Sequence, residues 1–174
     1  MLDVAISYNR YKFLGHEYLT WLWFAIEKGQ DEIKKLDQEP LSLQIGNRMV
    51  LVNRQKDAVE SITIKGDDAG LEEGILSLRK GAVVTELNLS YKTGDHEWRF
   101  TVKGESLHIV GFKCPQTGSV ESEEDLEGAV LEKIYLYDKA IQLTDHIFKQ
   151  FITLRLSEDW DKKVVPLMRQ WIYS

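Results

Sequence analysis

The chain has 174 residues, of which 43% are hydrophobic and 29% are charged; this composition excludes a disordered chain and fits one globular domain. Its formal net charge of −6 excludes a surface that is basic all over, so any nucleic-acid site must concentrate its cations in one place. A single cysteine, Cys114, excludes an internal disulfide and fits a reducing compartment.

The expected location follows from the absence of targeting signals. The chain begins without a basic stretch or a long apolar run, so we expect no signal peptide. Its most apolar stretch, residues 18–26, is far shorter than the roughly 20 residues that cross a bilayer. We therefore expect a cytoplasmic protein with no membrane partner.

The first predicted element is an unusually aromatic helix over residues 13–28. Its apolar residues recur every three or four positions, and a glycine follows, as is typical after a helix. Tyr18, Trp21, Trp23 and Phe24 go nearly round this helix, whereas a surface helix needs only one apolar stripe. Two explanations stay open: burial on several sides by this chain, or one face that binds a partner.

Three strands and a helix are predicted next. We expect strands over residues 41–45, 48–52 and 58–65, and the Gly46-Asn47 pair between the first two predicts a tight hairpin. A helix over residues 69–79 follows, because its apolar residues return every three or four positions.

A second group of three strands is predicted over residues 83–91, 97–103 and 107–112, with short turns between them. Apolar residues alternate along these strands, as Trp98 and Phe100 do. This alternation predicts an antiparallel meander with one buried face.

A long helix is predicted from about residue 122 to residue 156. An apolar seam steps through it by fours and threes, as in a heptad repeat: Val130, Ile134, Tyr137, Ile141, Thr144, Phe148 and Phe151. At 1.5 Å per residue such a helix is roughly 50 Å long, which exceeds the width of a small domain. A last helix is expected over residues 160–172, with a kink or restart at Pro166.

This order of elements predicts an α+β fold, in which two three-stranded antiparallel groups pack with helices and a long C-terminal helix. We expect a single domain over residues 1–174 that ends in a short C-terminal helix over residues 157–174.

No catalytic or metal site can be read from the residues. His108 and Cys114 lack the spacing of a zinc site, and the sequence has neither a phosphate-binding glycine loop nor a nucleophile elbow. We interpret Cys114, which precedes a proline, as an inert thiol. Acidic pairs lie at predicted helix N-termini, where they complement the helix dipole. We therefore expect no enzyme activity, no metal and no cofactor.

Basic residues cluster in three places: Lys34-Lys35, Arg79-Lys80, and Lys162-Lys163 with Arg169. Each cluster is offset by nearby acids, so a solvated face is the first interpretation of each. Arg79-Lys80 stands out because it ends a predicted helix just before a strand.

Two stretches resemble a known family. The stretch LGHEYLTWLWF at residues 14–24 is similar to the "LGxEFLTWLW" block of the recombination-associated protein RdgC family. The stretch RKGAVVTELNL at residues 79–89 is similar to the "GxVVTKLxL" strand in the C-terminal half of that family, although Glu86 stands where the family often has lysine. The resemblance covers residues 13–156.

The resemblance implies a non-catalytic protein that binds DNA without sequence specificity, as a ring-shaped dimer, and antagonises RecA-driven recombination. We therefore expect double-stranded DNA as a partner, with phosphate contacts from Arg79, Lys80, Lys92 and Arg99.

The alternative is an assembly protein that forms a homodimer and binds no nucleic acid. Trp and Tyr are enriched at the energetic centres of interfaces. The residues predicted for such an interface come from the two apolar helices: Trp21, Phe24, Tyr137 and Phe148.

Overall fold

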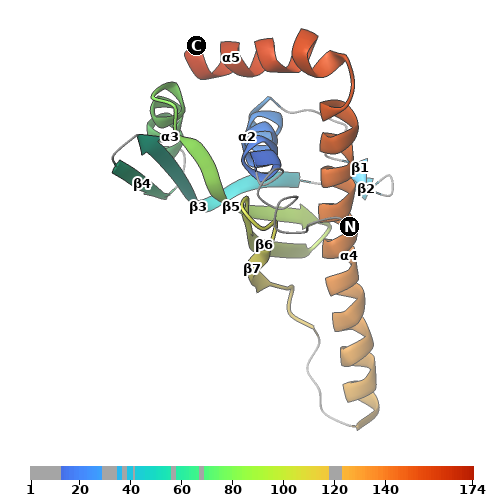
Figure 1. The fold of residues 1–174 in the computed structure, drawn as a ribbon. Helices are drawn as coiled ribbons and strands as arrows, with labels where there is room; N and C mark the ends of the chain where they lie inside the picture. The colour runs from blue at the N-terminus through green and yellow to red at the C-terminus, as the bar shows by residue number, and fades with distance from the viewer. Residues whose placement is uncertain are drawn as a thin grey trace, which may run out of the picture.

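The computed structural model of the protein describes residues 13–28, 35–36, 39–40, 42–55, 58–66, 69–117 and 123–174. Figure 1 shows a sheet with helices above it and one long helix that runs along its side. The elements in chain order are α2 (Phe13–Glu27), β1 (Lys35–Leu36), β2 (Glu39–Pro40), β3 (Ser42–Gln55), β4 (Ala58–Lys65), α3 (Ala69–Arg79), β5 (Val83–Thr93), β6 (His96–Lys103), β7 (Ile109–Lys113), α4 (Glu123–Arg155), a π-helical turn (Trp160–Val164) and α5 (Val165–Tyr173).

Five strands form one antiparallel sheet in the order β4-β3-β5-β6-β7, and β1 pairs with β2 separately. The predicted α+β class and the long C-terminal helix are confirmed. The predicted meander is the β5-β6-β7 half of this sheet. The strands do not divide into two three-stranded groups, because β3 pairs with β5 and joins both halves.

The hairpin predicted at Gly46-Asn47 is wrong, because β3 runs through this pair as one strand of 14 residues. The register of β3 against β5 shifts between Ile45 and Met49, so the pair lies in a β-bulge. A two-residue hairpin of type I′ needs positive φ at both central residues, and neither Gly46 nor Asn47 has it.

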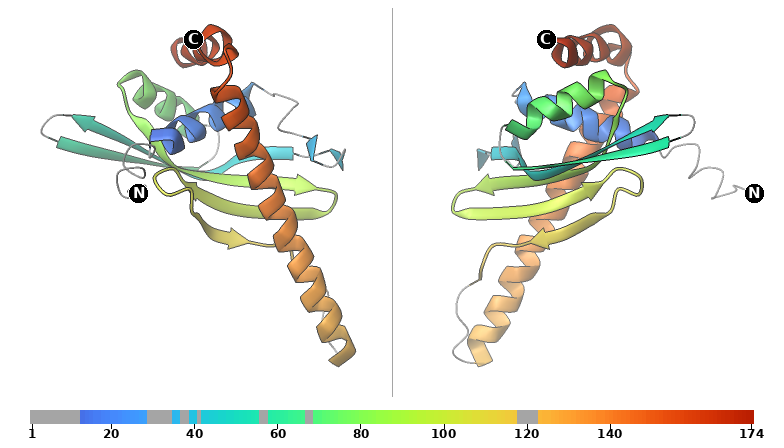
Figure 2. Two further views of the ribbon diagram at one scale, coloured as in Figure 1. Left: turned by 45° about the vertical axis from the view of Figure 1, so that its right-hand side comes forward. Right: turned by 90° about the vertical axis from the view of Figure 1, so that its left-hand side faces the viewer.

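Helix α2 fills the centre of the core. Figure 2 shows α2, α3 and α5 on the same side of the sheet. The inner face of the sheet under α2 is apolar because alternate residues of β5 and β6 point to it. The buried side chains of this face include Leu87, Leu89, Tyr91, Trp98, Phe100 and Val102.

Two further helices enclose the aromatic side chains of α2. The ring of Tyr18 lies 5.2 Å from that of Phe148 in α4, measured between centroids. The rings of Trp23 and Phe24 lie 5.1 Å and 5.6 Å from that of Trp171 in α5. Of the two explanations for the aromatic helix, burial on several sides by this chain is therefore the one observed.

The start of α2 touches the backbone of the sheet. A Cβ atom placed on Gly15 would lie 1.6 Å from the carbonyl oxygen of Gly104, in the turn after β6. Only a residue without a side chain allows this approach, which fixes the height of α2 above the sheet.

The chain turns sharply between α4 and α5. The guanidinium of Arg155 at the end of α4 donates from Nε to Glu17 of α2 at 2.7 Å and lies 5.3 Å from the ring of Trp160. Pro166 occupies the first turn of α5, where a missing backbone N–H costs nothing. The predicted restart at Pro166 is confirmed, after a π-helical turn.

Candidate functional site

The two faces of the five-stranded sheet differ in kind. One face lies under α2, and we call the other the open face. At the paired positions of β5 and β6, the open face carries only polar side chains: Glu86, Asn88, Ser90, Lys92, Glu97, Arg99, Thr101 and Lys103. It is polar because these residues alternate with the buried ones along each strand.

Positive charge is concentrated on the open face. Among the residues at paired strand positions whose side chains the structure describes, six cations lie on this face with two carboxylates, Glu86 and Glu97, which leaves a net charge of +4. The cations come from all five strands: Arg48, Lys65, Lys92, Arg99, Lys103 and Lys113. The chain as a whole carries −6, so the open face has the opposite sign to the molecule.

Each carboxylate of the open face lies between two cations. Glu86 forms ion pairs with Arg48 at 3.2 Å and with Lys103 at 3.5 Å. Glu97 forms ion pairs with Arg99 at 2.9 Å and with Lys92 at 3.7 Å. The four cations keep about half of their side-chain surface exposed, so each can still reach an external anion.

The ionised form of Glu97 is favoured by its neighbours. Ser90 donates a hydrogen bond to Glu97 Oε1 at 2.9 Å, and Arg99 Nε donates to the same oxygen at 2.9 Å. The hydrogen bond from Ser90, followed by that from Arg99, lowers the pKa of Glu97. Glu97 is therefore a permanent anion at neutral pH.

A polar hollow of about 280 Å³ lies in the open face across β3, β5, β6 and β7. Its lining contains three cations, Lys92, Arg99 and Lys113, and one carboxylate, Glu97. The remaining lining residues are Gln44, Ile45, Gly46, Asn47, Asn88, Ser90 and Gly111. Three cations against one carboxylate make this hollow suited to an anion.

The bulge in β3 shapes one wall of this hollow. A Cβ atom on Gly46 would lie 1.9 Å from the amide oxygen of Asn88, so glycine lets β3 close over that side chain. The Asn88 amide is itself held, because Nδ2 donates to the Phe100 carbonyl at 3.1 Å and to Thr101 Oγ1 at 2.9 Å.

The structure brings two of the four predicted phosphate contacts together and separates the others. Lys92 and Arg99 lie on the open face on either side of Glu97. Arg79 is the last residue of α3 and Lys80 follows it, and Arg79 Nε donates to the Ile172 carbonyl at 2.5 Å. The Lys80 carbonyl accepts a hydrogen bond from Asn53 Nδ2, which lies at the end of β3 far from Lys92 and Arg99. The two pairs are therefore about 30 Å apart along the sheet, at roughly 3.3 Å per residue.

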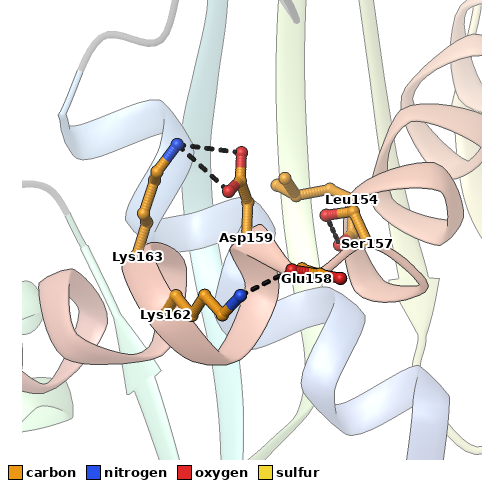
Figure 3. A network of polar contacts seen from close by, with 6 residues as sticks. All are labelled: Leu154, Ser157, Glu158, Asp159, Lys162 and Lys163. Atoms are coloured by element: carbon orange, nitrogen blue, oxygen red, sulfur yellow. Dashed lines mark hydrogen bonds and ion pairs between the residues drawn. The ribbon is translucent and has the colours of Figure 1, made fainter.

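The basic pair Lys162-Lys163 lies away from the sheet, in the π-helical turn (Figure 3). Lys162 pairs with Glu158, and Lys163 pairs with Asp159 at 3.0 Å. Both pairs link residues four apart on an exposed helix, so this cluster has the character of a solvated face.

The four predicted interface residues do not form one surface. Trp21 and Phe24 are 1% and 2% exposed and lie in the core, so neither offers a surface to a partner in this conformation. Phe148 is half-buried against Tyr18. Tyr137 is exposed, and its ring lies 4.9 Å from Phe112.

The described residues bear on metal binding and on the reactivity of Cys114. Within them, no three His, Cys, Asp or Glu side chains gather to hold a metal ion. Cys114 is partly buried, and this burial raises the pKa of its thiol, which favours the unreactive protonated form. In the part of the chain that the structure describes, no helix is long and apolar enough to cross a membrane.

Sequence reasoning missed four cations of the open face: Arg48, Lys65, Lys103 and Lys113. The alternation of polar and apolar residues could have placed Lys103 on the same face as Arg99. Arg48 and Lys65 join this face through the β3–β5 pairing, which the predicted hairpin concealed.

Comparison of the chain with protein-family models, with curated proteins and with solved structures found no match in any of the three.

Proposed function

We propose that this chain is a non-catalytic, RdgC-like module that binds double-stranded DNA without sequence specificity through the open face of its sheet. The observation that carries this proposal is the net charge of +4 on one face of a chain whose total is −6. Concentrated cations on an acidic protein are the arrangement that phosphate binding needs, because an acidic surface elsewhere repels the duplex.

The size of the open face suits a duplex. Five strands at about 4.8 Å spacing span roughly 19 Å. A duplex carries one negative charge per 1.7 Å of its axis, so a length of 19 Å presents about 11 phosphates. This number is ample for six cations.

The side chains of the open face favour a duplex over a single strand. Proteins that bind single strands stack the bases on aromatic side chains. At its described paired positions, the open face has no Phe, Tyr or Trp, because the aromatic residues of β5 and β6 point inward. Contacts from Lys and Arg to phosphates carry no sequence information, which supports binding without sequence specificity.

The test is a salt-dependent titration of the full chain with a fluorescent 20-base-pair duplex. Each neutralised phosphate adds about −0.9 to the slope of log K against log salt. Between four contacts (the net charge) and six (all cations), the slope should lie between about −3.6 and −5.4. Two unrelated duplex sequences should bind alike. No binding at 50 mM salt would refute the proposal.

A matched pair of double variants locates the site. Lys92→Ala with Arg99→Ala should weaken binding and make the slope shallower by about 1.8, because two phosphate contacts are lost. Lys162→Ala with Lys163→Ala removes the same charge from the π-helical turn and should change the slope little. Equal effects of both double variants would mean that the open face is not the binding surface.

A further inference from the structure

The first half of α4 exposes an apolar surface that the described residues leave uncovered. Figure 1 shows this part of α4 extending past the sheet. Besides Tyr135, which lies further round the helix, six large apolar side chains there are between 42% and 60% exposed: Leu126, Val130, Leu131, Ile134, Tyr137 and Ile141. Soluble monomers rarely expose contiguous apolar patches larger than a few hundred Å², and larger patches usually mark interaction sites.

Four of these side chains follow the spacing of a coiled coil. Val130, Ile134, Tyr137 and Ile141 are separated by four, three and four residues, which places them on one stripe of the helix. We call this stripe the exposed seam. Towards the end of α4 the same heptad positions fall on Phe148 and Phe151, which pack on Tyr18 in the core. The heptad residues in the second half of α4 are therefore packed against this chain, whereas those in the first half of α4 are exposed.

We propose that the exposed seam binds the exposed seam of a second copy of this chain, as a short parallel coiled coil. Leu126 and Leu131 flank the seam at the positions that heptad notation calls g and e, where they widen the apolar contact.

The charges beside the seam select the parallel orientation. Lys133 holds a g position and Asp138 holds the e position five residues later. In a parallel coiled coil these two positions face each other across the interface, so Lys133 of each copy meets Asp138 of the other. In an antiparallel pair, g faces g and e faces e, which brings no lysine to an aspartate here. Asp138 also accepts a hydrogen bond from Gln142 at 2.6 Å, which holds its carboxylate on the helix surface.

The area of contact predicts a weak dimer. If each of the six side chains contributes about 80 Å², two copies bury about 1,000 Å² in total, close to the lower limit for a specific interface. The dimer should therefore dissociate in the micromolar range, and the monomer should be observed at low concentration.

The first test is sedimentation velocity of the full chain without DNA, from about 1 to 500 µM, on the wild type and two matched variants. Ile134→Lys places a charge in the seam and should raise the dissociation constant at least tenfold. Tyr135→Lys is the control, because Tyr135 is equally exposed but lies about 100° further round the helix. It should change the constant less than twofold. A wild type that stays monomeric at 500 µM, or equal effects of both variants, would overturn the proposal.

The second test concerns orientation and uses substitutions that leave the seam intact. Lys133→Asp and Asp138→Lys should each weaken the dimer about three- to tenfold, and the double variant should recover to within about threefold of the wild type. A double variant as weak as the single ones would rule out the parallel coiled coil. These measurements contain no DNA, so their outcome is independent of the proposed DNA binding.

Discussion

Replacing Glu97 by glutamine should strengthen DNA binding. The two side chains have nearly the same shape, and glutamine can still accept the hydrogen bond from Ser90. The substitution removes the negative charge that Lys92 and Arg99 share. Both cations are more than half exposed, so these ion pairs stabilise the fold little and the variant should remain folded.

The expected gain in affinity follows from counterion release. The substitution raises the net charge of the open face by one unit, which frees about one cation for a phosphate. One further phosphate contact adds about −0.9 to the slope of log K against log salt. Relative to 1 M salt, this contact raises the association constant about 15-fold at 50 mM and about fourfold at 200 mM. The gain should therefore shrink as salt rises, which a gain from new hydrogen bonds to bases would not do to the same extent.

The assay is fluorescence anisotropy with the same 20-base-pair duplex at four salt concentrations. Glu86→Gln is a positive control, because Glu86 is shared by Arg48 and Lys103 on the same face and its loss should act in the same direction. Glu158→Gln is the negative control, since it releases Lys162 at a remote site. A folded Glu97→Gln variant that binds no tighter than the wild type at 50 mM would refute the reasoning.

Three further predictions concern the fold and its titration. Gly15→Ala should lower the free energy of unfolding in urea by about 3 kcal/mol or more, because its Cβ meets backbone that cannot rotate away. Gly128→Ala on exposed α4 is the control and should raise that free energy by about 0.5–1 kcal/mol. Similar effects of both would contradict the close approach at Gly104. Trp98→Phe should cost about 1–3 kcal/mol, since it removes the hydrogen bond from Trp98 Nε1 to the Leu136 carbonyl at 3.0 Å; an unchanged unfolding midpoint would show that this bond contributes little. By NMR, Glu97 should titrate below its ordinary value of 4.5, and its charge therefore stabilises the fold above that pH and ceases to do so as the pH falls through the lowered pKa. Ser90→Ala should move this midpoint upward more than Lys92→Ala does, because the hydrogen bond is the larger cause, and the reverse order would contradict that ranking.

Local patterns predicted the helices and most strands well, and they failed where a distant residue decides the conformation. The helix over residues 69–79 and the strand over residues 58–65 have the predicted bounds. The Gly46-Asn47 pair predicts a hairpin because a glycine next to an asparagine is typical of one. In the structure Gly46 is needed for its contact with Asn88, a residue 42 positions later, and no local pattern contains that information.

The candidate site was predictable only in part for the same reason. Lys92 and Arg99 lie on the same face of one short hairpin, opposite Glu97 and Ser90 respectively, so a correct pairing of neighbouring strands suffices to place them together. Arg48 reaches Glu86 only through the pairing of β3 with β5, across the whole of β4 and α3. Arg79 and Lys80 lie just before β5 in sequence, but the length of that strand separates them from Lys92.

The position of Trp171 against Trp23 and Phe24 has a consequence for the folding of the nascent chain. These contacts join residues separated by about 147 positions of sequence, so they contribute strongly to contact order. At about 5–20 residues per second, the ribosome takes roughly 7–30 s to add that length of chain. During this interval the aromatic rings of α2 lack the cover that α5 later provides. We therefore expect truncation within α5 to increase aggregation more than truncation of an equally long exposed segment.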